Sequence, residues 1–269
     1  MRVLRVRYQD KFFYAALLQQ ESPEGEGPIL EVQCLNKEMG FAEPIPLQQV
    51  QVVPPVVPTK IVCLAVNYRT HANEVGRAIP DEPVLFLKPP SAVIGSGQPI
   101  IMPPQSKRVD YEGELALIIG KHCRNVAPED AAGCLFGYAC ANDVTARDLQ
   151  KKDGLFARAK GFDTFAPIGP WIETQVDDPG NLRLRTFVND TLRQEGSTSD
   201  MIFTPFEALS FVSSVMTLQP GDVILTGTPA GIGSLNPGDE VRVEIEGVGA
   251  LINPVISAVL DEPSNAPLQ

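Results

Sequence analysis

Short apolar runs, closed off by glycine and proline, constrain the fold of this chain more than any other feature. The chain contains 22 Gly and 25 Pro, and they border runs of strand length such as IVCLAV, VLFL, LALIIG, DVILTG and VRVEIEG. Runs of this length between turn residues predict strands. So many turns favour a mixed, strongly curved β-sheet with helices at its margins over a doubly wound sheet. We therefore predict an α+β fold.

Helical patterns are fewer and short. The best lie around residues 71–77, 128–134, 144–152 and 205–216. The tripeptide Pro-Gly-Asp occurs at 220–222 and at 237–239, each time before an apolar run. This arrangement predicts a tight turn that leads into a strand.

The first 58 residues differ from the rest of the chain. Residues 1–20 alternate and cluster apolar groups, and residues 21–28 are rich in Glu, Gly and Pro, which predicts hairpin strands around a loop. Repeated prolines over 44–58 favour extended backbone and predict a linker. We therefore expect a small β-rich module with its linker over 1–58 and a main domain over 59–269. The polar residues 261–269 are expected to fray.

The charge balance excludes several classes of partner. Against 33 Asp and Glu stand 22 Lys and Arg, a net charge of −11, so phosphate backbones and anionic lipid are repelled. We expect no nucleic-acid partner and no membrane association. An anionic substrate would need a local positive charge in the site. Five cysteines without a C-x-x-C spacing suit reduced thiols in the cytoplasm.

Two glutamates two residues apart form the strongest local feature. In DYEGE (110–114), a strand would turn Glu112 and Glu114 to one face and Gly113 to the other. An isolated pair of this kind is more often a solvated strand edge. Here Ala116 and Ile118 continue the same face, so the pair lies where the strand enters the core. Adjacent, partly buried anions repel unless a cation lies between them.

A third carboxylate, Asp143, follows the apolar run at 135–141 and precedes a helical pattern. It can lie at a strand end that projects into a cleft, or it can be a helix N-cap. With Glu112 and Glu114 it would form an all-oxygen site without Cys or His. Such a site suits Mg²⁺ or Mn²⁺ better than zinc or copper.

The chain has only two histidines. If residues 67–74 are helical, Glu74 lies beside His71 and could orient the imidazole as a general base. A surface His–Glu pair without a role is the commoner outcome of this spacing. We interpret His122 as a loop residue with no role. The glycine-rich segment 227–233 matches neither the dinucleotide fingerprint nor the P-loop pattern.

Seven segments together resemble the fumarylacetoacetate hydrolase superfamily, and the likeness covers almost all of residues 59–256. They occur in the order that the family shows, and the members resembled most are the small acylpyruvases and the oxaloacetate decarboxylases or tautomerases. The segments are NYRTHANE, EPVLFLKPPSAVIG, VDYEGELALIIG, GYACANDVTARDLQ, AKGFDTFAPIGPW, RQEGSTSDMIF and PGDVILTGTPAGIG. Residues 1–58 lie outside this core likeness.

The resemblance implies a mixed β-sheet roll, usually as a homodimer, and a role for particular residues. Glu112, Glu114 and Asp143 align with the metal ligands of the family, His71 and Glu74 with a catalytic pair on a lid helix, and Lys160 with an active-site lysine. On the substrate side, Gln150 aligns with a polar residue of the lid or pocket and Thr228 with a threonine that contacts ligand. Arg147 is also placed among the substrate-side residues. For both Arg147 and Lys88 we expect an electrostatic or structural role.

The resemblance and the charge argument together predict a small 2-oxo acid as substrate. The leading hypothesis is hydrolysis of a C–C bond in an acylpyruvate-type 2,4-dioxo acid through an enolate, with Mg²⁺ or Mn²⁺ polarising the keto group. Decarboxylation of oxaloacetate and keto–enol tautomerisation of 2-oxo dicarboxylic acids are the alternatives within the same chemistry. A protein that binds a 2-oxo acid without turning it over is the alternative outside catalysis.

Overall fold

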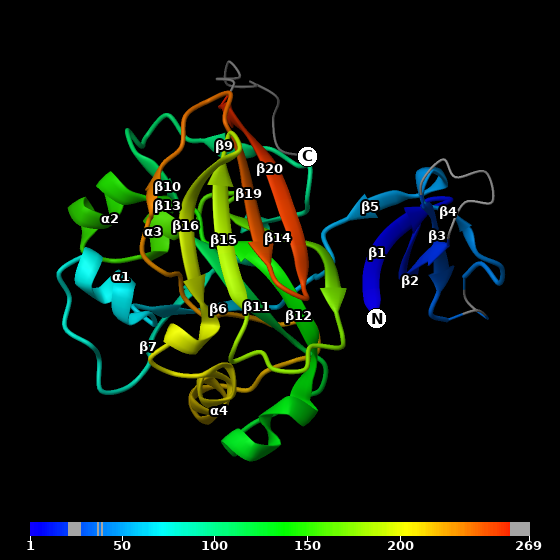
Figure 1. Cartoon of the computed structure of the whole chain (residues 1–269), viewed down its shortest axis with the longest axis horizontal. Coiled ribbons are helices and arrows are strands. Elements are labelled where there is room, and N and C mark those ends of the chain that lie inside the picture. The colour runs from blue at the N-terminus through cyan, green and yellow to red at the C-terminus, as the bar shows by residue number, and fades with distance from the viewer. Residues whose placement is uncertain (21–27, 37, 39, 259–269) are drawn as a thin grey trace, which may run out of the picture.

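The computed structural model describes the whole chain except residues 21–27, 37, 39 and 259–269. The predicted loop at 21–28 falls almost entirely outside the described residues, and the predicted frayed tail at 261–269 falls there completely. The described part is mostly β-sheet with a few short helices (Figure 1), which confirms the α+β prediction.

Among the described residues the strands form three sheets. The strands of the largest sheet are β1 (Arg2–Tyr8), β2 (Lys11–Gln20), β3 (Ile29–Cys34), β4 (Ile45–Pro46), β5 (Gln51–Val53), β6 (Ile61–Ala65), β7 (Val84–Lys88), β8 (Val93–Ile94), β11 (Gly113–Ile119), β12 (Leu135–Asn142), β14 (Ala166–Glu173) and β17 (Val223–Leu225). A small sheet consists of β10 (Val109–Tyr111), β13 (Thr145–Ala146) and β18 (Gly233–Ser234). The third contains β9 (Ile100–Met102), β15 (Arg183–Val188), β16 (Thr191–Ser197), β19 (Glu240–Ile245) and β20 (Gly249–Ser257).

The helices are short and lie at the margins of these sheets (Figure 1). The α-helices are α1 (Arg69–Glu74), α2 (Arg147–Asp153), α3 (Ala157–Lys160) and α4 (Pro205–Val215), and the 3-10 helices are η1 (Leu47–Gln49), η2 (Pro90–Ala92), η3 (Pro128–Cys134) and η4 (Thr198–Asp200). The longest, α4, begins with a capping box in which Thr204 and Glu207 satisfy each other's backbone N–H groups. No helix in the described ranges is both long and apolar enough to cross a bilayer.

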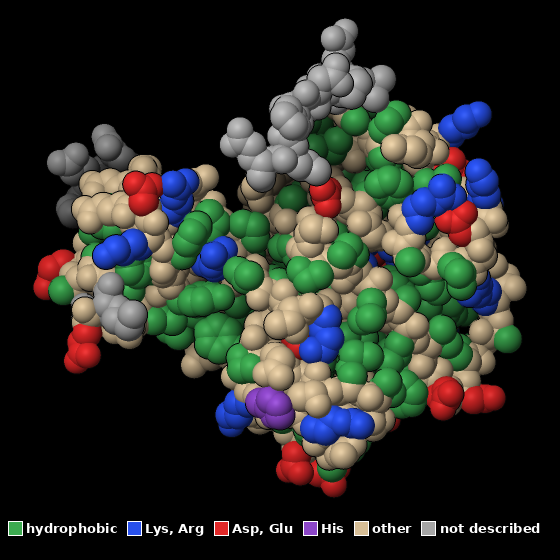
Figure 2. All heavy atoms as spheres, turned by 180° about the vertical axis from the view of Figure 1, so that it is seen from behind, with side chains coloured by type: hydrophobic (Ala, Val, Ile, Leu, Met, Phe, Trp, Pro, Cys, Tyr) green, Lys and Arg blue, Asp and Glu red, His purple; other side chains and the backbone are tan. Residues whose placement is uncertain are grey.

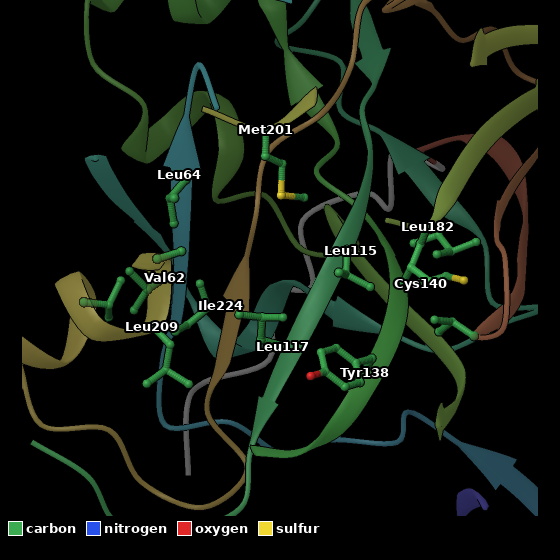
Figure 3. Packing of buried hydrophobic residues seen from close by; sticks show 14 of the residues in the cluster. Val62, Leu64, Leu115, Leu117, Tyr138, Cys140, Leu182, Met201, Leu209 and Ile224 are labelled. Carbon is green, nitrogen blue, oxygen red and sulfur yellow. The ribbon is translucent and has the colours of Figure 1, made fainter. Parts of the chain in front are cut away.

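Strand β11 is the centre of the core because both of its faces are buried. It pairs with β12 on one side and with β17 on the other. Leu115 and Leu117 pack into one hydrophobic cluster with residues of α4 and the third sheet, while Ala116 and Ile118 pack into a second cluster on the opposite face. Figure 3 shows the first of these clusters around Leu115, Leu117 and Leu209. A strand buried on both faces needs a continuous apolar run, and LALII supplies it.

The N-terminal strands β1–β5 form a unit at one side of the molecule (Figure 1). Strand β1 pairs with β2 and β5, and its first residues pair with the end of β14, Arg2 opposite Glu173. The proline-rich segment 44–58 therefore contributes strands β4 and β5 as well as connecting chain. The division into 1–58 and 59–269 stays a prediction. Figure 2 shows hydrophobic side chains at the surface where this unit meets the body, and exposed Phe12, Val57 and Phe136 line an apolar groove there.

Three of the predicted helices differ in detail from the structure. The segment 128–134 is a 3-10 helix, and the helix expected at 71–77 lies at Arg69–Glu74. The helix expected from residue 144 begins only at Arg147, because Thr145 and Ala146 pair with β10 as a short strand. Both Pro-Gly-Asp turns precede strands as predicted, with Gly221 and Gly238 at the positive φ that such turns require.

Candidate active site

Three carboxylates from separate segments meet in the interior. Glu112 lies between β10 and β11, Glu114 lies in β11, and Asp143 follows β12. Each offers an oxygen within 4.8 Å of the other two, and the three residues are only 5%, 1% and 1% exposed. The β11–β12 pairing brings them together, because the backbone N–H of Asp143 donates to the carbonyl of Glu112 over 2.8 Å.

Gly113, between the two glutamates, points to the opposite face, where the third sheet approaches closely. A Cβ at this position would lie 2.3 Å from Thr186 Oγ1 and 3.2 Å from a methyl group of Val243. Only a residue without a side chain fits between the strands there. The E-G-E pattern thus separates a packed face from a face that carries carboxylates.

Two buried lysines contact the triad. Lys160 Nζ donates to Glu112 Oε2 over 2.9 Å and also pairs with Asp143. Lys88 Nζ donates to the other oxygen of Asp143 over 2.5 Å. Burial by itself lowers the pKa of Lys160, but the negative charges of Asp143 and Glu112 outweigh it and raise the pKa above its usual value. Lys160 therefore carries positive charge inside the site.

The pKa values of the two glutamates shift in opposite directions, although burial raises both. Burial by itself raises the pKa of Glu112, but the positive charges of Lys160 and Arg147 and the effect of His71 outweigh it and lower the pKa to about 2. For Glu114, burial and the charge of Asp143 together raise the pKa well above its usual value. Glu114 accepts a 2.7 Å hydrogen bond from the backbone N–H of Gly227, yet no Lys or Arg of the described residues lies within ion-pair distance of it.

This donor set fits a divalent cation. Carboxylate oxygens are the ligands that Mg²⁺ and Mn²⁺ prefer, and one oxygen of each residue lies within 4.8 Å of the other two. The under-compensated charge of Glu114 is what a bound cation would neutralise. Glu112, Glu114 and Asp143 are therefore the residues that would hold the ion.

His71 and Glu74 lie on α1 and face the same cavity as the triad, which has a volume of about 510 Å³. His71 Nδ1 lies 3.0 Å from Glu74 Oε2, and the other Glu74 oxygen accepts a 2.9 Å hydrogen bond from the backbone N–H of Gly231. His71 is buried rather than part of a surface pair. His122, in contrast, is exposed in the turn after β11 and does not line the cavity.

The three residues predicted on the substrate side also line this cavity. Thr228 Oγ1 donates to the carbonyl of Gly113 over 2.8 Å. Arg147 pairs with Glu112, donates from Nε to Asp110 over 2.9 Å and from Nη1 to Gln150 over 2.7 Å. All three nitrogens of the Arg147 guanidinium are therefore engaged by the protein, which makes Arg147 a support for Glu112 in this structure.

Sequence reasoning missed the roles of Arg108 and Asp110. Asp110 is fully buried and is shared by Arg108 and Arg147. A signal was present, because Arg108, Asp110, Glu112 and Glu114 occupy alternate positions of one extended segment. Charged residues at a strand period on a buried face indicate a connected polar network.

The fold therefore brings mixed sheets, a buried carboxylate triad and the contact of His71 with Glu74 together at one cavity. Residues 60–256 match the family described as "Fumarylacetoacetate (FAA) hydrolase C-terminal". The chain belongs to the fumarylacetoacetate hydrolase family, as its motifs indicated.

Similar proteins include enzymes with different named activities. The mitochondrial oxaloacetate tautomerase Fahd2a of Rattus norvegicus is 40% identical over 223 residues, which cover 79% of this chain and 71% of that protein. The structure of 5-carboxymethyl-2-hydroxymuconate delta-isomerase from Mycobacterium smegmatis matches with a TM-score of 0.86 and 41% identity, over 96% of this chain and 100% of the other. Maleylpyruvate hydrolase from Sphingobium sp. SYK-6, solved with manganese(II) and pyruvate, matches with a TM-score of 0.78 and 32% identity over the same shares.

Proposed function

We propose that this chain is a divalent-metal-dependent enzyme that acts on a 2-oxo acid through an enolate, and that its leading reaction is hydrolysis of a C–C bond in an acylpyruvate-type 2,4-dioxo acid. The observation that carries the proposal is the contact of the buried His71 with Glu74, because both residues line the same cavity as the carboxylate triad. The cavity volume of about 510 Å³ leaves room for an acyl group beyond the 2-oxo acid.

In this proposal Glu112, Glu114 and Asp143 hold Mg²⁺ or Mn²⁺. The bound ion supplies Lewis-acid polarisation of the 2-oxo group. Lys160, held by Glu112 and Asp143, places an ammonium group beside the position where negative charge develops on the enolate oxygen. The manganese and pyruvate in the structure of the maleylpyruvate hydrolase support this assignment of the ligand type.

His71 is proposed as the general base. With its Nδ1 proton donated to Glu74, its Nε2 is free to take a proton from water. The resulting hydroxide attacks the distal carbonyl, the C–C bond breaks, and the pyruvate enolate departs. The proton that His71 took from water is then available to protonate the enolate carbon, so His71 returns to its starting state.

Keto–enol tautomerisation of oxaloacetate is the second candidate. Decarboxylation of the same substrate is the related alternative, in which loss of CO₂ would leave the enolate of pyruvate. The identity of 40% with the rat oxaloacetate tautomerase favours tautomerisation. In this reaction His71 would move a proton between the substrate carbon and oxygen, and no water would attack.

Replacement of His71 by alanine tests the assignment. We expect kcat for acylpyruvate cleavage in Mg²⁺ to fall by about a hundredfold to ten-thousandfold, because a general base is lost. The matched control is His122→Ala, which removes the other histidine from an exposed turn and should leave kcat unchanged. Full retention of cleavage in His71→Ala would eliminate the proposed base.

A panel of 2-oxo acids with the wild-type protein separates the candidate reactions. Cleavage of acylpyruvates, tautomerisation of oxaloacetate and its decarboxylation are each followed with Mg²⁺, with Mn²⁺ and after chelation. Loss of acylpyruvate cleavage in His71→Ala with unchanged oxaloacetate decarboxylation would support separate roles at one site. Absence of turnover throughout the panel would favour a binding protein instead of an enzyme.

A further inference from the structure

A chain of alternating charges connects the carboxylate triad with the rim of the cavity. Glu112 pairs with Arg147, Arg147 Nε donates to Asp110 Oδ2 over 2.9 Å, and Arg108 Nε donates to Asp110 Oδ1 over 2.8 Å. Asp110 is fully buried, whereas the side chain of Arg108 is 50% exposed. This series of ion pairs therefore ends in the guanidinium group of Arg108, which lines the cavity.

Asp110 holds the guanidinium group of Arg108 in place, but not all of its N–H donors have a partner among the described residues. Arg108 contacts Asp110 at two points, because Nη2 also donates to Asp110 Oδ2 over 3.2 Å. Its Nη1 has no hydrogen-bond partner in the part of the chain that the structure describes. A guanidinium fixed on one edge loses little freedom when its remaining N–H groups bind a further carboxylate.

The net charge of the residues around the site is compatible with binding such an anion once a metal ion is present. The connected network pairs Arg108, Arg147, Lys160 and Lys88 with Asp110, Glu112 and Asp143, and Glu114 lies beside it. These charges balance when all are ionised, so a divalent ion would leave an excess of two positive charges. Within this network, two carboxylates of a substrate would offset that excess, one more than the 2-oxo acid end itself supplies.

We propose that Arg108 is a specificity-determining residue that binds a second carboxylate at the end of the substrate remote from the triad. The preferred substrates are then 2-oxo acids with a distal carboxylate. This inference rests on the proposed function only for the 2-oxo end of the ligand. Arg77 and Lys151 line the same cavity without an ion-pair partner among the described residues. They add positive charge at the rim, but no carboxylate fixes them as Asp110 fixes Arg108.

A matched pair of ligands tests the assignment by equilibrium binding. 2-Oxoglutarate and 2-oxovalerate have the same number of carbons and differ in the distal carboxylate. Calorimetric titration of the Mg²⁺-loaded protein should give a lower Kd for 2-oxoglutarate. In Arg108→Gln this preference should fall by roughly tenfold to a hundredfold, the worth of a hydrogen bond to a charged group, while the Kd for 2-oxovalerate stays nearly constant.

Two further variants make the result specific. Lys107→Gln removes the same charge from the neighbouring exposed residue, which does not line the cavity, and should preserve the preference. Arg108→Lys keeps the positive charge without the planar guanidinium and should retain part of the preference for 2-oxoglutarate. The Arg108→Lys variant also tests the proposal if Arg108→Gln fails to fold.

Equal affinity of the wild-type protein for the two ligands, or an unchanged preference in both Arg108 variants, would overturn the subsite. Failure of the proposed function has a different signature. In that case no 2-oxo acid is turned over, yet the ratio of the two dissociation constants still reports on Arg108.

Discussion

Glu114 is the residue on which the metal assignment depends most directly. Its carboxylate is 1% exposed and has one backbone N–H donor, and no cation of the described residues pairs with it. The lysines lie instead on Glu112 and Asp143. An uncompensated buried carboxylate is costly, and a bound divalent ion would compensate its charge.

Glu114→Gln should therefore weaken Mn²⁺ binding by at least about tenfold to a hundredfold, because a charged ligand is replaced by a neutral one. The amide oxygen can still accept from Gly227, so the fold should persist. Titration of Mn²⁺ followed by electron paramagnetic resonance measures the affinity. Glu129→Gln, at an exposed position in η3, is the control. Unchanged affinity in Glu114→Gln would contradict the ligand assignment.

At the scale of elements, the parallel pair β6 and β17 is held together at its start by Asp222. Lys60 Nζ pairs with one oxygen of Asp222, and the backbone N–H and hydroxyl of Thr59 donate to the other over 2.9 and 2.7 Å. Burial raises the pKa of Asp222, but the hydrogen bonds from Lys60 and Thr59 outweigh it and lower the pKa below its usual 3.8.

The lowered pKa predicts how stability depends on pH. A carboxyl group whose folded pKa lies below its unfolded value stabilises the fold above the unfolded pKa, and this contribution is lost as the pH falls through the folded pKa. We expect Asp222→Asn to lower the free energy of unfolding at neutral pH and to flatten its decline below about pH 4. Urea denaturation across the acid range measures both effects.

The comparison for this prediction is Asp239→Asn, which changes the aspartate of the second Pro-Gly-Asp turn. Among the described residues Asp239 pairs with no Lys or Arg and contacts Asn189 and Asn236. An acid profile that keeps its slope in Asp222→Asn would show that the ion pair at the start of β6 and β17 does not contribute to stability.

At the scale of the whole molecule, we expect the chain to form a homodimer, as the family resemblance implied. The apolar groove beside the β1–β5 unit exposes Phe12, Val57 and Phe136, and association is one way to cover such a surface. Light scattering coupled to size exclusion should give a mass near twice the 29.1 kDa of one chain. A mass equal to that of one chain at micromolar concentration would contradict the prediction.

Much of the fold could be predicted from local patterns. The runs IVCLAV and LALIIG became β6 and β11, and the capping residues before α4 lie where the helical pattern begins. The helix predicted from residue 144 began late because Thr145 and Ala146 pair with β10. Pairing with a distant strand overrides local propensity, and one sequence does not reveal that pairing.

By itself the sequence determined which side chains lie side by side within one strand or one helix, because this depends only on the repeat of the backbone. The spacing of two residues set Glu112 and Glu114 side by side, and the spacing of three set His71 against Glu74, because strands and helices repeat at fixed intervals. Only the tertiary structure decided that Asp143 joins the glutamates, that Lys88 reaches Asp143, and that Asp110 fixes Arg108. Except for the short link from Asp110 to Arg108, these contacts depend on which strands pair and in what register, and that is set by packing of the whole core.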